Sequence, residues 1–290
     1  MSYPDNNYSE PATIKAIRTY YQFLTRLYLP VAAIKAAPPG GWPAITRKTF
    51  RALGKSDTVV SLLANLPYPS QDGCDFQNMD EIEVAGHCRF ADWRSQVPSN
   101  EHSNSEDIRR EVGLVTEGQV WDRVPPHVVG LTTGGREKSV MLLDMRRGVV
   151  YWLNAPTALV DHYDGRLDEL APTKVRFEDE AWEFAGDAAM WSVQGFFEML
   201  KEEFRTLRMV PVRTCQVLDV YTQYIGIEEL VTTFQAVFRD QGWPEKADGF
   251  NKDVCLAEVQ RKVEEFFPGE IAFSEHLGSD VRGTLWGETI

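Results

Sequence analysis

Apolar residues recur every three or four positions in several stretches of the chain, the spacing that predicts amphipathic helices. The first stretch covers residues 12–29 and ends at Pro30, and the second begins at Ser56 as an N-cap and stops at Pro67. A longer one follows Ser192 and keeps one apolar face as far as Leu207. The last two stretches, residues 227–241 and 253–267, predict a helical hairpin. Helices are therefore expected on both sides of the middle of the chain.

The middle of the chain has the apolar runs that predict β-strands. The strongest signal is SVMLLDMRRGVVYWLN, where two such runs flank a turn from Asp144 to Gly148, with Gly148 at the position that needs a positive φ. The run VVGLTT from Val128 is expected to pair beside this hairpin. Residues 95–111 are so polar that they predict a solvated loop, and residues 154–190 predict an irregular acidic connection.

The predicted fold class is α+β. It has a mainly antiparallel sheet with an N-terminal helix packed on it, a long helix after the sheet, and a C-terminal helical pair. Residues 1–212 are expected to form the α+β domain, and residues 213–290 a helical extension packed on it.

The tripeptide Gly-Trp-Pro occurs at residues 41–43 and again at 242–244, each time after a helical segment. Glycine permits a positive φ and proline fixes the new chain direction, so the tryptophan can fold back over the end of the helix. For Trp42 we favour packing in the core, with contact to a partner as the alternative.

The chain of 290 residues is acidic, with 43 Asp and Glu against 30 Lys and Arg and a net charge of −13. Such a charge opposes binding to nucleic acid or to an anionic membrane surface. It attracts a basic protein, although acidity that serves solubility alone is the simpler alternative.

The sequence has no apolar run of the roughly 20 residues that a membrane span needs, and its start lacks the regions of a secretion signal. The four cysteines, Cys74, Cys88, Cys215 and Cys255, are widely scattered, which favours reduced thiols and a cytoplasmic location. Whether Cys74 and Cys88 ever pair stays open.

Motifs for chemistry are weak. The five histidines are far apart, and Cys74 with the Gly86–Cys88 stretch lacks the paired spacing of a zinc site, so neither a metal nor a cofactor is expected. Residues 161–165 (DHYDG) are typical of a turn, and the glycine pair after residue 133 lacks the spacing of a phosphate-binding loop. No catalytic residues are therefore assigned. An unrecognised hydrolase that uses Asp161, His162 or His127 is one alternative.

An acidic stretch with interleaved aromatic residues is the preferred interaction site. Acidic and aromatic side chains together are typical of a protein-recognition surface, although an ordinary hydrated loop is the alternative. The candidate partner-binding residues are Glu178, Asp179, Glu180, Trp182, Phe184 and Trp191, together with Trp42.

The order of these features resembles the SUKH superfamily, which includes fungal cell-wall-assembly regulators and bacterial toxin-immunity proteins. The resemblance covers residues from about 12 to 210, and uncharacterised fungal proteins are the most similar in style. It rests on the Gly-Trp-Pro turn at residue 41, the Leu143–Trp152 hairpin, and the helix residues Ser192, Phe196, Phe197 and Leu200. The resemblance implies an α+β domain that binds other proteins without a cofactor. The polar insertion near residues 96–107, the long 154–190 connection and the helical C-terminal part depart from the compact family pattern.

The first functional hypothesis is therefore a non-enzymatic protein-interaction module whose partner is another protein of basic character. The second is a structural or decorating subunit of a larger assembly, which includes a virus particle. The hydrolase is the third.

Overall fold

The computed structural model describes residues 8–70, 82–96, 105–135, 139–174, 188–222 and 229–266. The α-helices in these ranges are α1 (Glu10–Leu27), α2 (Asp57–Asn65), α3 (Trp93–Gln96), α4 (Ser105–Glu117), α5 (Thr157–Tyr163), α6 (Val193–Arg205), α7 (Leu230–Asp240) and α8 (Lys252–Phe266). The strands are β1 (Ile34–Lys35), β2 (Tyr68–Pro69), β3 (Arg89–Phe90), β4 (Val128–Gly130), β5 (Thr132–Thr133), β6 (Met141–Asp144), β7 (Val149–Trp152), β8 (Thr173–Lys174), β9 (Ala189–Ser192), β10 (Met209–Pro211) and β11 (Val217–Asp219). The predicted α+β fold class with antiparallel sheets is confirmed.

Serine caps begin three of the helices where the sequence pattern starts. The Ser56 hydroxyl accepts the backbone N–H of Val59 at 3.3 Å at the start of α2, and the Ser192 hydroxyl accepts that of Gly195 at 3.0 Å at the start of α6. Ser9 caps α1 in the same way. Each cap satisfies a backbone donor that has no partner within its helix, so the predicted starts at Ser56 and Ser192 are confirmed.

The main sheet has five strands in the order β4-β6-β7-β9-β8, and every neighbouring pair is antiparallel. Strands β6 and β7 form the predicted hairpin, with Gly148 at φ 69°. The Asp144 carboxylate holds the turn because it accepts the backbone N–H groups of Arg146 and Arg147. Strand β4 pairs with β6, as expected from the run at Val128.

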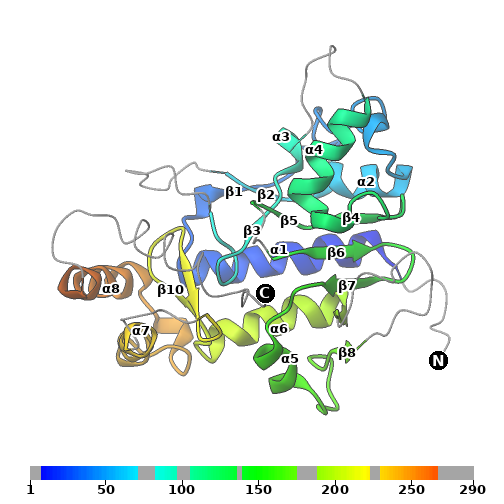
Figure 1. Ribbon diagram of the computed structural model, residues 1–290. Coiled ribbons are helices and arrows are strands. Elements are labelled where there is room, and N and C mark those ends of the chain that lie inside the picture. Colours follow the sequence, from blue (N-terminus) through cyan, green and yellow to red (C-terminus); the bar gives the residue numbers. More distant parts are fainter. Residues whose placement is uncertain are drawn as a thin grey trace, which may run out of the picture.

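Successive strand residues divide between two apolar clusters because side chains alternate across a sheet. The larger cluster includes Met141, Leu143, Trp152 and Trp191, together with residues of α1 and α6. The smaller cluster includes Leu142, Val149, Tyr151 and Met190. Helix α6 covers the first face, and α1 packs beside α6 across the middle of the molecule (Figure 1).

Two sequence predictions are wrong. Residues 105–117 form helix α4, although residues 95–111 had the composition of a loop, because Ile108 and Val112 lie one turn apart and are buried while the polar residues face outward. Residues 154–190 are not irregular throughout, since they contain α5, β8 and the start of β9. The buried residues Leu159, Val160 and Tyr163 give α5 its apolar side.

The C-terminal helices α7 and α8 pack against each other, as predicted, on one side of the molecule (Figure 1). Gly242, with φ 89°, follows α7, and Trp243 is buried there with its indole N–H donated to the carbonyl of Phe204. The expected boundary between residues 212 and 213 falls inside the β10–β11 hairpin. One apolar cluster includes residues from both sides of this boundary, from Ile17 to Val263.

Helix α4 approaches strand β4 so closely that the contact requires glycine. A Cβ atom added to Gly130 would lie 2.2 Å from the backbone carbonyl oxygen of Thr116. Since backbone atoms cannot move aside as a flexible side chain can, the helix and the strand would have to separate.

We predict that Gly130→Ala lowers the free energy of unfolding by roughly 1–3 kcal/mol, the usual effect of overpacking. Gly249→Ala is the matched control, because a Cβ atom there meets nothing within 4 Å. Urea unfolding followed by circular dichroism measures both variants. Equal midpoints for the two variants would show that α4 and β4 are not in close contact.

Candidate functional site

Trp42 lies at the surface in a fixed orientation. Its indole N–H donates to the carbonyl of Leu66 at 2.8 Å, and the guanidinium of Arg94 lies 4.8 Å from the centre of its ring. Asp92 holds Arg94 through two hydrogen bonds of 2.8 and 2.6 Å. Trp42 is half-buried and packs against the main core, which agrees with packing as its first role.

Trp191 is not part of an exposed surface, which corrects its assignment as a partner-binding residue. Its side chain is 1% exposed, and its indole N–H donates to the carbonyl of Leu170 at 3.0 Å. The alternation along β9 turns Trp191 toward α6, where it packs on Phe196. The other candidates, Glu178, Asp179, Glu180, Trp182 and Phe184, lie outside the described residues.

The residues considered for a hydrolase come from two elements, the segment before β4 and helix α5. His127 precedes β4, with its Nε2 atom 3.7 Å from Oδ1 of Asp144, and burial lowers the pKa of its imidazole. Asp161 and His162 lie exposed near the end of α5. Asp144 serves the hairpin turn, so its contact with His127 is explained by the fold.

A buried polar network joins α5, α6 and the β10–β11 region around Glu203. One carboxylate oxygen of Glu203 accepts the Tyr163 hydroxyl at 2.7 Å and Nε of Arg208 at 2.9 Å, and the other accepts the Tyr221 hydroxyl at 2.7 Å. Arg208 also donates to the Tyr163 hydroxyl oxygen at 2.8 Å. Burial raises the pKa of both tyrosines above the usual range. Because Glu203 is bonded on both oxygens, the network is best explained as a structural connection.

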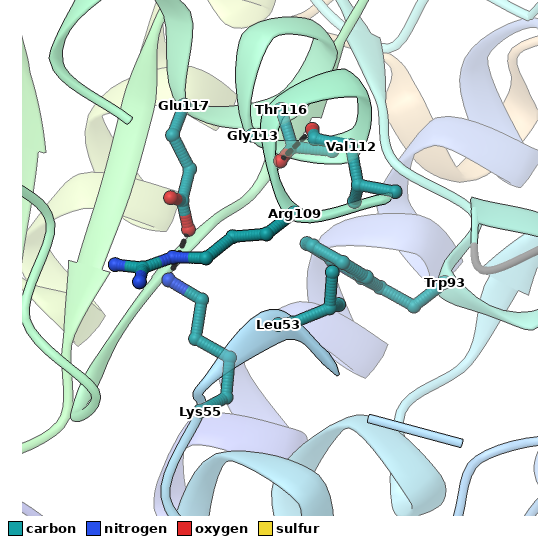
Figure 2. A pocket seen from close by; sticks show the side chains of 8 residues that line it. All are labelled: Leu53, Lys55, Trp93, Arg109, Val112, Gly113, Thr116 and Glu117. Atoms are coloured by element: carbon teal, nitrogen blue, oxygen red, sulfur yellow. Dashed lines mark hydrogen bonds and ion pairs between the residues drawn. The ribbon is translucent and has the colours of Figure 1, made fainter. Parts of the chain in front are cut away.

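A hollow of about 220 Å³, which includes its part open to solvent, lies where α4, the start of α3 and the segment before α2 meet (Figure 2). Its enclosed part has room for about one water molecule. Apolar and charged side chains both line it: Leu53, Lys55, Trp93, Arg109, Val112, Gly113, Thr116 and Glu117. It combines a concave shape with buried charges, so it is the candidate site.

Lys55 and Glu117 form a buried ion pair in this hollow, with side chains 7% and 4% exposed. The Lys55 ammonium donates to Glu117 and also to the carbonyl of Val128 at 2.9 Å. Burial lowers the pKa of Lys55 and raises that of Glu117, while each partner's charge opposes the shift of the other. Loss of either side chain alone would leave a buried charge uncompensated, at a cost of about 3–5 kcal/mol.

The ion pair also completes the hydrogen bonding of strand β4. Val129 pairs with Leu143 of β6, so the peptide groups of Val128 and Gly130 face away from β6. Lys55 donates to the Val128 carbonyl, the Glu117 carboxylate accepts the Gly130 N–H, and the Trp93 indole donates to the Gly130 carbonyl at 3.1 Å. Three side chains thus take the place of a further strand at this edge.

Arg109 projects from α4 over the ion pair, and Figure 2 shows its guanidinium reaching toward both Lys55 and Glu117. Its charge lowers the pKa of each of them. Within the ranges that the structure describes, no ion pair involves Arg109. The hollow therefore has one more positive charge than negative charge.

No group of three or more His, Cys, Asp or Glu side chains in the described residues could hold a metal ion. Among the helices of that same part of the chain, none has the length and apolar character to cross a bilayer. Comparison of the chain with models of known protein families, with curated proteins and with solved structures finds no match.

Another buried ionisable residue, Glu83, lies at the contact between the end of α1 and the β10–β11 hairpin. The Glu83 carboxylate accepts the backbone N–H of Val217 at 2.7 Å, and the Glu83 carbonyl accepts the Tyr28 hydroxyl at 2.7 Å. Burial raises the pKa of Glu83 to about 7. The charge of Asp219 adds to this rise, whereas the charges of His87 and Arg89 lower the pKa and so oppose it. The folded protein therefore favours the protonated form of Glu83 more than the unfolded chain does.

We predict that stability falls as pH rises through about 7, because the raised pKa makes ionisation of Glu83 unfavourable in the fold. Glu83→Gln keeps an acceptor for Val217 and removes the titration. Urea unfolding between about pH 5 and 8 should give a steeper decline for the wild type than for the variant. Since all other titratable groups are shared, parallel curves would contradict the assignment to Glu83.

Proposed function

We propose that the chain is a non-enzymatic protein-binding module whose acidic segments bind a basic protein. The distribution of charge supports this proposal. Acidic and basic residues are equal in number within the described ranges, so the net charge of −13 belongs entirely to the segments outside them. The packed body is neutral, and a basic partner would be attracted to those segments.

The segment of residues 175–187 is the best candidate for this contact. It connects β8 to β9, which pair through Thr173 with Met190 and Lys174 with Ala189 at the end of the main sheet. The strand residues on either side of it, Lys174 and Ala189, are thus paired with each other. Its sequence includes Glu178, Asp179 and Glu180 followed by Trp182 and Phe184, a combination of charge and aromatic anchors that suits protein recognition.

The resemblance to SUKH proteins agrees with this proposal, because it implies protein binding without a cofactor. The fold contains the elements on which the resemblance rests: the Gly-Trp-Pro turn, the β6–β7 hairpin and helix α6. A cytoplasmic location is also part of the proposal. It is supported by Cys88, Cys215 and Cys255, which are buried and lie outside any disulfide bond.

We predict that the triple variant Glu178→Gln, Asp179→Asn, Glu180→Gln loses a basic partner that the wild type captures from native lysate in stoichiometric amounts. Capture at low and high salt, followed by native mass measurement, tests this. Salt should weaken the complex because exposed charges are screened. Trp182→Ala with Phe184→Ala should weaken it by at least about tenfold, as expected for aromatic anchors.

The matched control neutralises three exposed acidic residues elsewhere: Asp107→Asn, Glu111→Gln, Glu264→Gln. It changes the net charge equally and should leave capture unchanged. Equal loss in both triple variants would indicate attraction by total charge alone. Recovery of no stoichiometric protein by the wild type at either salt concentration would overturn the proposal.

A further inference from the structure

Basic side chains gather in the first part of an otherwise acidic chain. Between Glu10 and Asp57 the sequence has no acidic residue, although 43 of its 290 residues are Asp or Glu. The same stretch has eight basic residues: Lys15, Arg18, Arg26, Lys35, Arg47, Lys48, Arg51 and Lys55. The first three of them belong to helix α1.

Helix α1 presents these charges on one face. Lys15, Arg18, Gln22 and Arg26 follow one another at steps of three and four residues, which places them on the same side of the helix, and all four are exposed. The opposite side of α1 is buried in the main core. We call these four residues the basic face of α1. It is about 16 Å long, because each helical residue adds about 1.5 Å.

The fold leaves the charges of this face without a partner. In the part of the chain that the structure describes, no ion pair or hydrogen bond involves the side chain of Lys15, Arg18 or Arg26. The helix dipole favours Arg26, which lies in the last turn, but it does not account for Lys15 or Arg18. Those two are neighbours of like charge on the helix surface, which destabilises the helix slightly. A bound anion would offset this repulsion.

Carboxylates at the borders of the basic face limit the kind of anion. Glu10 precedes the face on α1, and Glu198 and Glu202 lie on α6, which packs beside α1. Arg205 of α6 lies 5.5 Å from the ring centre of Phe23 on α1, and 3.7 and 3.5 Å from the two glutamates. A nucleic acid or a membrane surface extends beyond the face and would be repelled by these carboxylates, whereas a short acidic segment fits within it.

We propose that the basic face of α1 binds a short acidic segment of a partner protein in extended conformation. Three carboxylates on alternate residues of an extended chain span about 13 Å, close to the length of the face. Lys15, Arg18 and Arg26 pair with these carboxylates, and the Gln22 amide donates to a backbone carbonyl of the segment. The site is independent of the acidic segments proposed above for protein binding, because it lies on another element and has the opposite charge.

Titration of the full chain with a fluorescently labelled, capped hexaglutamate peptide, followed by fluorescence anisotropy, tests the proposal. The triple variant Lys15→Gln, Arg18→Gln, Arg26→Gln should bind the peptide about tenfold more weakly, because each exposed ion pair contributes little and three are lost. Added salt should weaken the wild-type complex. Glutamine is a good helix former and the replaced charges repel each other, so urea unfolding should show no loss of stability in the variant.

The matched control is the triple variant Arg110→Gln, Arg146→Gln, Arg239→Gln, which replaces exposed arginines of α4, the β6–β7 turn and α7. It changes the net charge equally and should bind hexaglutamate as the wild type does. A capped hexaglutamine peptide should not bind. The triple variant of the acidic segment described above should also keep hexaglutamate binding, so the two proposals can fail separately.

Absence of saturable hexaglutamate binding by the wild type would overturn the proposal. Equal losses in the basic-face variant and the control variant would also overturn it, since they would show attraction by surface charge only. Tighter binding of a short single-stranded DNA or of phosphatidylserine vesicles than of hexaglutamate, lost in the basic-face variant, would contradict the assignment to an acidic protein segment.

Discussion

The open edge of strand β4 has peptide groups that face away from the rest of the sheet, and the fold around it is arranged to satisfy them. An unpaired buried peptide group is costly, and an exposed strand edge can pair with another chain. Here the hydrogen bonds come from Lys55, Glu117 and Trp93, which precede α2, end α4 and begin α3. Three segments distant in sequence are thereby fixed to one strand.

This arrangement explains why a lysine and a glutamate are buried together. Two apolar side chains would fill the same volume without the cost of removing charges from water, but they could not hydrogen-bond to Val128 and Gly130. The ion pair therefore completes the hydrogen bonding of the β4 edge, in addition to the attraction between its two charges. The close approach of α4 at Gly130 belongs to the same arrangement, because it places Glu117 within reach of the strand. Arg109, about two turns before Glu117 on α4, then stands over a charge pair that is already fixed.

Local patterns predicted much of the fold. The hairpin at Gly148 and the helices α1, α2 and α6 follow from periodicity, turn glycine and serine caps that lie close together in sequence. Helix α4 was missed because its first turn is polar, and its apolar side is limited to residues such as Ile108 and Val112. Trp191 was assigned to an acidic surface because its neighbours in sequence are acidic, whereas its direction depends on the strand pairing of β9. The Lys55–Glu117 pair could not be predicted, since it joins residues 62 positions apart through tertiary packing alone.

Hydrogen exchange of the Gly130 amide tests most directly whether side chains complete the edge of β4. In the wild type this amide should exchange as slowly as that of Val129, which faces the neighbouring strand β6. In Glu117→Met, which removes the carboxylate that accepts the Gly130 N–H, this amide should exchange much faster while that of Val129 stays protected. Rapid exchange of Gly130 in the wild type, at the rate of an exposed amide, would contradict the proposed closure of the sheet edge.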